Sequence, residues 1–208
     1  SSSDSKISII DLSLVPEDVV HLVTAVLARV VFETLQRYRK INGELLPTSL
    51  IVDEAHNFMS WKPRGQKGEE YDADTVCRNI FRKIAKEGRK FGLGLLVSSQ
   101  RPAELDDTVL SQCNTVLLHR LSNQRDFEKV SALVPSQLSG FLDFLPALPQ
   151  RQALVLGAAV SIPVLMEVDH LPDAHRPDSK DPEFWRCWTT DPKTSPKLQE
   201  IVRDWQGD

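Results

Sequence analysis

The segment that most constrains the fold of this chain is residues 50–54, where an apolar run ends in two adjacent carboxylates, Asp53 and Glu54. A short run without polar residues is typical of a strand buried in a parallel sheet. Open sheets of this kind bind their ligands at the carboxyl ends of the strands. The pattern therefore predicts that both acids stand at the ligand-binding edge of an α/β fold.

The same residues have the form of a Walker B strand. In that form, Asp53 holds Mg²⁺, mostly through water, and Glu54 orients and deprotonates the water that attacks the γ-phosphate of ATP. In a second interpretation, the two acids only cap the next helix. A zinc protease is excluded, because H-E-x-x-H needs two histidines one helical turn apart and only His56 is present here. We expect His56 to be a local hydrogen-bonding residue.

The phosphate-binding partner of this strand is missing from the sequence. The pattern G-x-x-x-x-G-K-[ST], whose backbone N–H groups cradle phosphates, does not occur around any of the nine glycines. The chain thus carries half of an ATPase site, and alone we expect it to be inactive. Because a serine-rich start leads directly into a predicted strand, we expect a segment of a longer protein.

Composition narrows the classes of protein further. The 208 residues suit one domain with appendages, and a hydrophobic content of 41% with 26% charged residues is typical of a soluble globular protein. A net charge of −4 opposes a globally basic nucleic-acid binder but leaves room for a local basic patch. The three cysteines form no C-x-x-C pair, which favours a cytoplasmic protein without zinc or disulfides. Neither a signal peptide nor an apolar run of about 20 residues is visible, so we expect no membrane attachment.

Predicted strands alternate with predicted helices through the first part of the chain. The first helix opens at Pro16 and stops at Asn42-Gly43. The alternation predicts an α/β fold with a mostly parallel sheet and helices on both faces. The strands are expected at residues 6–11, 50–53, 93–99 and 115–119.

In the carboxyl-terminal part, the alternation of strands and helices stops. Residues 152–156 and 163–168 are predicted to pair as strands around Gly157, and they complete a first domain over residues 1–169. Frequent prolines then predict an extended arm over residues 170–208.

This arm is too apolar for a pure linker. We expect a short helix near residues 195–206. Its aromatic residues are Phe184, Trp185, Trp188 and Trp205. The three tryptophans either anchor the arm on a neighbouring subunit or cover the core of their own domain.

Two further polar residues end predicted strands. Gln100 follows the strand at 93–99 and would lie beside Glu54 if the two strands are adjacent, where its amide can hold the attacking water or sense the γ-phosphate. It can equally be an ordinary polar residue at a loop start. Arg120 follows the strand at 115–119, at the same expected edge. It is a second candidate for phosphate contact, with a surface or structural ion pair as the alternative.

A stripe of basic residues lies on the helix predicted around residues 75–90. The stripe comprises Arg78, Arg82, Lys83, Lys86, Arg89 and Lys90. The simplest interpretation is a solvated face. In the second interpretation, one arginine reaches the γ-phosphate of the nucleotide bound to a neighbouring subunit, and the other residues contact a nucleic-acid backbone. Arg89 is the candidate for this arginine finger, because it lies just before the strand that leads to Gln100.

In combination, these motifs resemble a known family. The chain reads IIDLS before a long apolar helix, then LIVDEAH, IAKEGRKFGLGLLVSSQRP, LSQCNTVLLHRLSNQRD and FLPALPQRQALVLGAAVSIPV. Over about residues 7–168 this order resembles the carboxyl-terminal half of the HerA ATPases, in the HerA/FtsK group of P-loop motors. The resemblance implies a RecA-like P-loop NTPase core, with ATP and Mg²⁺ as ligands and hexameric rings that move on DNA. It matches Asp53 and Glu54 to the Walker B pair, Gln100 to the polar residue ending the fourth core strand, and Arg89 to the arginine before that strand. The phosphate loop would lie upstream.

Three functions remain open at this point. The leading hypothesis is a subunit of an ATP-driven DNA translocase or helicase. The second is an ATPase ring that serves as a scaffold for a partner effector in prokaryotic antiphage defence. Such an effector would be a nuclease or an NAD-consuming, sirtuin-like protein. The third is a separate interaction module without nucleotide chemistry.

Overall fold

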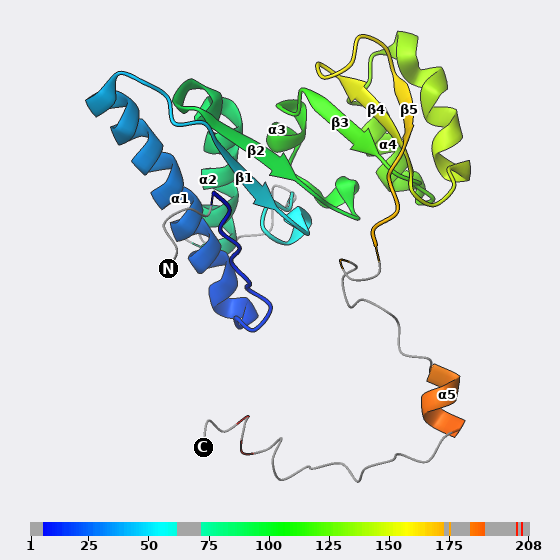
Figure 1. The fold of residues 1–208 in the computed structure, drawn as a ribbon, viewed down its shortest axis with the longest axis horizontal. Coiled ribbons are helices and arrows are strands. Elements are labelled where there is room, and N and C mark those ends of the chain that lie inside the picture. Colours follow the sequence, from blue (N-terminus) through cyan, green and yellow to red (C-terminus); the bar gives the residue numbers. More distant parts are fainter. Residues whose placement is uncertain are drawn as a thin grey trace. The chain divides into compact units, whose positions relative to one another are not determined.

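A computed structural model describes residues 6–61, 72–172, 175, 184–189, 203 and 205. The chain divides into two compact units, Ser1–Val168 and Asp169–Asp208. The first unit contains both sheets (Figure 1).

The first element is the helix α1, Glu17–Asn42. It follows Pro16, whose fixed φ suits the start of a helix, and it ends at Gly43 in the left-handed conformation, with φ 72°. Both predicted ends are confirmed. By length and composition alone, the part Val19–Asn42 could also cross a membrane. Core helices of globular proteins pass the same test, and α1 contributes Phe32 and Leu35 to the core of its unit.

A short parallel sheet follows, made of β1, Thr48–Val52, and β2, Leu93–Val97, with Val52 opposite Val97. The crossover between the strands contains η1, Ala55–Asn57, the helix α2, Ala73–Glu87, and η2, Gly88–Phe91. The predicted parallel pairing of these two strands is confirmed.

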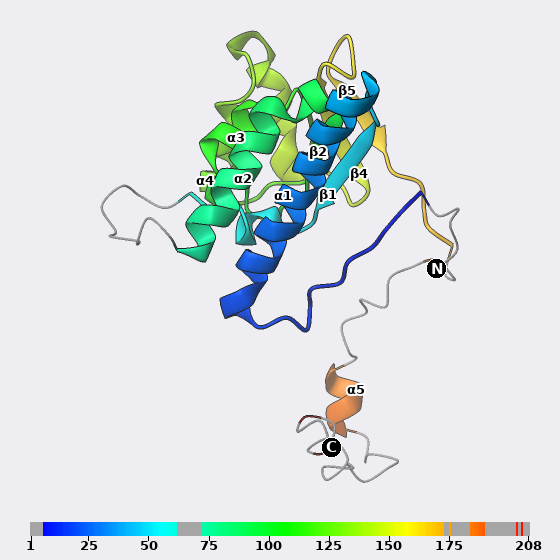
Figure 2. The same cartoon turned by 90° about the vertical axis from the view of Figure 1, so that its left-hand side faces the viewer.

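The core of this part lies on one face of the β1–β2 pair. Figure 2 shows α1 and α2 side by side, and apolar residues of both helices join a single buried cluster with the strands. The opposite face bears Ile51 and Leu96, which are partners in register and are 65% and 53% exposed. The expectation of helices on both faces is therefore met on one face only within the described residues.

The second sheet is antiparallel, in the order β3, Thr115–Leu118, β4, Gln152–Gly157, and β5, Val164–Glu167. Two short elements precede it in the chain, η3, Pro102–Glu104, and α3, Asp107–Ser111, and α3 packs against α2 in the first core. Between β3 and β4 lie α4, Gln124–Ser131, and η4, Ser136–Ala147, which share the second core with this sheet. The predicted β4–β5 pair is confirmed. The prediction that residues 115–119 join the parallel sheet is wrong, because β3 pairs antiparallel with β4, with Leu118 opposite Leu154. Local sequence predicts a strand but carries little information on its partner.

Residues 6–11 were predicted as a strand, and this is also wrong. They are irregular, and Ile7, Ile9 and Ile10 are exposed. An alternating apolar segment becomes a strand only when a partner strand supplies its hydrogen bonds. Among the described strands, none pairs with residues 6–11.

In the second unit the structure describes one helix, α5, Phe184–Thr189. Trp185 and Trp188 on this helix are exposed, as is Trp205. The helix predicted near residues 195–206 lies almost entirely outside the described residues.

Candidate functional site

The carboxyl end of β1 carries Asp53 and Glu54 in an unusual turn. Glu54 has φ 45° and ψ 45°, a left-handed conformation that is uncommon for a residue with a side chain. Its N–H donates to Oδ1 of Asp53 over 3.0 Å. A left-handed residue of this kind costs on the order of 1–3 kcal/mol, and such residues cluster at functional sites. The strained turn therefore supports a functional role for this strand end.

Gln100 lies directly beside Glu54. Its Nε2 donates to Oε1 of Glu54 over 2.7 Å. The two strand ends are joined by backbone hydrogen bonds, from Ser98 N–H to Val52 C=O and from Ala55 N–H to Ser98 C=O. The predicted neighbourhood of Gln100 and Glu54 is thus confirmed, because β1 and β2 are parallel and end at the same edge.

His56 makes contact with both strand ends. Its Nδ1 lies 3.1 Å from Oγ of Ser99 and 3.3 Å from Oε2 of Glu54. The side chain is only 12% exposed. The prediction of a local hydrogen-bonding role is confirmed. The contact between His56 and Glu54 was not predicted from the sequence. Its signal was the short spacing, because His56 follows Glu54 by two residues within one tight turn.

The loop after Gln100 is held to α4 by Asp126, a residue that belongs to none of the sequence motifs. The side chain of Asp126 is largely buried and its Oδ1 accepts the N–H of Ala103 over 2.9 Å. Within the loop, the N–H of Arg101 donates to Oγ of Ser99 over 3.0 Å. These contacts fix the backbone that carries Gln100. Nothing in the local sequence of α4 signals the role of Asp126, because its partner is 23 residues away.

Arg89 lies at the other end of β2. It is exposed in η2, which precedes β2, whereas Gln100 follows β2. A strand of five residues separates the two ends by about 16 Å. Arg89 therefore stands at the sheet edge opposite to Glu54 of its own chain, and its predicted role requires a second subunit.

Arg120 is placed differently from the prediction. It follows β3, which belongs to the antiparallel sheet, so it does not end a strand of the β1–β2 sheet. Its side chain is exposed. The expectation that Arg120 stands at the same sheet edge as Glu54 relied on β3 being a strand of the parallel sheet, and this part of the prediction is wrong.

The basic stripe divides into two groups. Arg82 donates through Nε and Nη2 to Oδ2 of the fully buried Asp106, over 2.9 and 2.6 Å. Arg78 donates to the backbone C=O of Ser60 over 3.2 Å. Both arginines therefore stabilise their own domain. Nζ of Lys83 lies over the ring of Phe32, 5.4 Å from its centroid, within the domain. The other exposed members of the stripe, Lys86, Arg89 and Lys90, remain for contacts with other molecules.

The Arg82–Asp106 pair shifts the pKa of both groups. Burial raises the pKa of Asp106, but the hydrogen bonds and charge of Arg82, with the N–H groups of Thr108 and Val109, outweigh it and lower the pKa overall. The hydrogen bond from Arg82 to Asp106 raises the pKa of the guanidinium. The carboxylate also caps α3 by accepting from both N–H groups. Asp106 is thus a structural acid and not a catalytic one.

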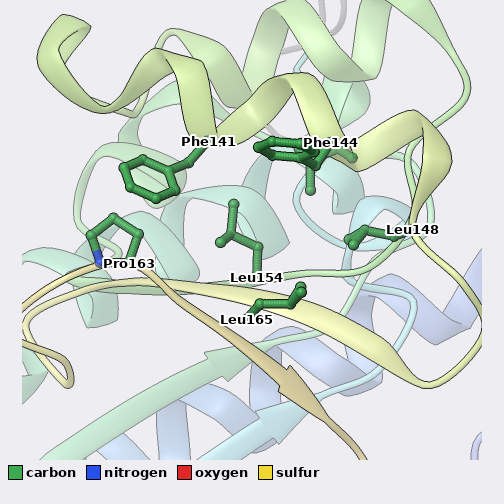
Figure 3. A pocket seen from close by; sticks show the side chains of 7 residues that line it. Phe141, Phe144, Leu148, Leu154, Pro163 and Leu165 are labelled. Atoms are coloured by element: carbon green, nitrogen blue, oxygen red, sulfur yellow. The ribbon is translucent and has the colours of Figure 1, made fainter.

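A pocket of about 340 Å³ lies between η4 and the β4–β5 hairpin (Figure 3). The aromatic rings of Phe141 and Phe144 face Leu154 and Leu165 across it. Its lining is entirely apolar side chains. Because phosphates require N–H or cationic donors, this pocket is not suited to the triphosphate of a nucleotide.

The strand end suits a water-coordinated magnesium ion. Asp53 is an exposed carboxylate that directly precedes Glu54, and its Oδ1 accepts the N–H of Glu54. Among the described residues there is no cluster of three or more His, Cys, Asp or Glu that could enclose a metal. Mg²⁺ in nucleotide sites needs only one or two carboxylates, because water and phosphate oxygens complete its shell. Asp53 fits this role.

No family model matches the chain. Over 122 residues, or 59% of the chain, it is 38% identical to the DNA double-strand break repair helicase HerA of Pyrococcus furiosus. Over 202 residues, or 96% of the chain, it is 27% identical to the HerA helicase of Sulfolobus acidocaldarius. The chain is a homologue of HerA-family helicases over most of its length.

These relatives are much longer than the chain. The matched regions cover 20% of the Pyrococcus protein and 38% of the Sulfolobus protein. The homology therefore establishes a relation to helicase and ATPase enzymes.

The fold resembles a solved viral ATPase. The DNA-packaging ATPase B204 of Sulfolobus Turreted Icosahedral Virus matches 70% of this chain and 62% of its own, with a TM-score of 0.50 and 16% sequence identity. This likeness shows an α/β fold similar to that of a packaging ATPase. B204 of a second such virus was solved in complex with AMPPCP and matches with a TM-score of 0.47, at 18% identity over 70% of this chain and 62% of its own.

Proposed function

We propose that this chain is the part of an ATP-driven DNA translocase or helicase that carries the Walker B strand, the sensor glutamine and the arginine finger. The observation that carries the proposal is the hydrogen bond between Gln100 and Glu54 at the shared carboxyl edge of two parallel strands. The homology to HerA helicases supports it independently.

The roles of the residues follow from their positions. Glu54 accepts a proton from the water that attacks the γ-phosphate, and Gln100 holds the carboxylate and this water in line. Asp53 holds Mg²⁺ through water, and the ion neutralises charge on the phosphates when bound. The phosphate-binding loop comes from outside the 208 residues.

A homo-oligomer is part of this proposal. Arg89 is exposed at the sheet edge opposite to Glu54 of its own chain, so it reaches a γ-phosphate only across a subunit boundary. A closed ring, expected to be a hexamer, gives every site a neighbour that supplies this arginine. The exposed Lys86 and Lys90 are the candidates in this region for contacts with DNA phosphates.

The experiment is ATP turnover by the complete product of the reading frame that encodes this chain, with and without duplex DNA. Glu54→Gln keeps the shape of the side chain and removes the base, so turnover should fall by at least about 100-fold while ATP binding persists. Arg151→Gln, in an exposed ion pair with Glu167, serves as the control and should keep full turnover. Wild-type turnover in Glu54→Gln, or a reading frame without a phosphate loop, would contradict the proposal.

A second function has support from the charge distribution. Arg78 and Arg82 are occupied within the domain, and the chain has a net charge of −4, which leaves a small basic surface. An ATPase ring that acts as a scaffold for a nuclease or a sirtuin-like effector, as in antiphage defence, needs little DNA contact. Turnover that does not respond to DNA at low salt would favour this scaffold over the translocase.

A further inference from the structure

We propose that His56 is a positioning residue, which holds the carboxylate of Glu54 in the orientation that its reaction requires. The inference rests on the proposed function, because it assigns a role to His56 only if Glu54 is the base. It starts from one contact: Nδ1 of His56 lies 3.3 Å from Oε2 of Glu54.

The two oxygens of Glu54 face two different neighbours. Oε1 accepts the amide of Gln100, which comes from the end of β2. Oε2 is buried and has no hydrogen-bond partner among the described residues, and Nδ1 of His56, 3.3 Å away, is the group placed to become its donor. A buried carboxylate oxygen without a hydrogen-bond partner is unfavourable, so a hydrogen bond from His56 would stabilise this position of the Glu54 side chain.

Hydrogen-bond chemistry selects one form of the histidine. An ionised carboxylate only accepts hydrogen bonds, so Nδ1 must carry the hydrogen to interact with Oε2. The hydroxyl oxygen of Ser99 accepts the N–H of Arg101 and still has a second lone pair. It can therefore accept from the same Nδ1–H over 3.1 Å. With hydrogen on Nδ1, one donor is shared between the ends of both strands.

This arrangement matters because Glu54 is otherwise weakly restrained. Its side chain has three rotatable bonds and is 39% exposed, and its backbone is in a left-handed conformation. A carboxylate held at both oxygens loses this freedom before the reaction starts. Misplacement of a reacting group by about 1 Å can cost about 100-fold in rate. His56 thus acts through Glu54 and has no direct contact with substrate in this proposal.

The test compares three variants in the complete reading-frame product. His56→Ala removes the donor, whereas His56→Asn keeps an N–H at the atom that corresponds to Nδ1. We expect kcat for ATP to fall about 10- to 100-fold in His56→Ala with KM nearly unchanged, and to return to within about 3-fold of wild type in His56→Asn. His119→Ala is the matched control, because Nδ1 of His119 contacts only the backbone C=O of Gln152 in the second sheet, and kcat should not change.

The outcomes separate the inference from the function on which it rests. Unchanged kcat in His56→Ala, together with loss of turnover in Glu54→Gln, overturns the role of His56 and leaves the motor site standing. Equal losses in His56→Ala and His56→Asn also overturn it, because the shared N–H is then irrelevant. Normal turnover in Glu54→Gln overturns the proposed function itself. Thermal unfolding of each variant, with midpoints close to wild type, excludes a loss that comes from unfolding.

Discussion

At the scale of single residues, Asp106 is a buried carboxylate that stabilises the fold. It is fully buried, caps α3 and binds Arg82 through two hydrogen bonds. The sequence pattern placed Arg82 in a stripe that could meet DNA. The partner is 24 residues away, so helical spacing alone could not reveal that this arginine is occupied.

Asp106→Asn should destabilise the domain in a pH-dependent way. We expect a loss of about 2 kcal/mol in the free energy of unfolding at neutral pH, below the ~3 kcal/mol of a fully buried pair because Arg82 is 37% exposed. The pKa of Asp106 is lowered in the folded state, so its contribution is present above the ordinary carboxyl value of 3.8 and is lost as pH falls below it. The difference between the variant and wild type should therefore shrink below about pH 4.

Urea unfolding at a series of pH values measures this difference. Glu33→Gln is the control, because Glu33 pairs with Arg29 on the exposed surface of α1 and its loss should have little effect. A constant difference between pH 7 and pH 3 would contradict the electrostatic role of Asp106.

At the scale of elements, the β3–β4 pairing depends on a glycine. Gly157 ends β4 opposite Thr115 and has φ 101°. A Cβ at this position would lie 2.1 Å from the C=O of Asn114, which accepts the N–H of Ala158 over 2.8 Å. A side chain must therefore push the neighbouring backbone away and break this hydrogen bond.

Gly157→Ala should lower the free energy of unfolding by about 2 kcal/mol or more, since steric overlap is added to an unfavourable φ. Gly140→Ala is the matched control, because Gly140 has open space around it and no positive φ. It should be neutral or slightly stabilising. Thermal unfolding of both variants tests the prediction, and equal midpoints would show that the hairpin adapts to the added methyl group.

At the scale of the whole molecule, apolar surface is left uncovered on the first unit. Ile51 and Leu96 stand side by side on the bare face of the parallel sheet. The outward face of α1 carries a second apolar row, formed by Val19, Leu22, Val26 and Val30. Parallel sheets are normally covered on both faces, and exposed edges and patches promote association.

The 208-residue chain expressed alone should therefore self-associate. Sedimentation velocity should show species larger than the monomer at micromolar concentration. The double variant Ile51→Thr with Leu96→Thr should shift the distribution towards monomer, whereas Leu117→Thr, on the other sheet, should not. A single monomeric species for the wild-type chain would contradict this prediction.

The sequence by itself determined the features that depend on near neighbours. Pro16 and Gly43 set the ends of α1 through their restricted or permissive φ, and the acids after an apolar run marked the end of β1. The contact of Gln100 with Glu54 was also predictable, because parallel neighbours end at the same edge.

Only the tertiary structure decided which distant segments meet. Three such contacts join residues far apart in sequence: β3 with β4, Arg82 with Asp106, and His56 with Ser99. The place of Arg120 follows from the pairing of β3, and residues 6–11 are irregular because no described strand pairs with them. Backbone preferences act over a few residues, whereas strand pairing and buried ion pairs depend on the packing of the whole chain. For this reason the strand end that carries Glu54 and the neighbouring Gln100 were visible in the sequence, whereas the contacts of His56 and Asp126 around them were visible only in the fold.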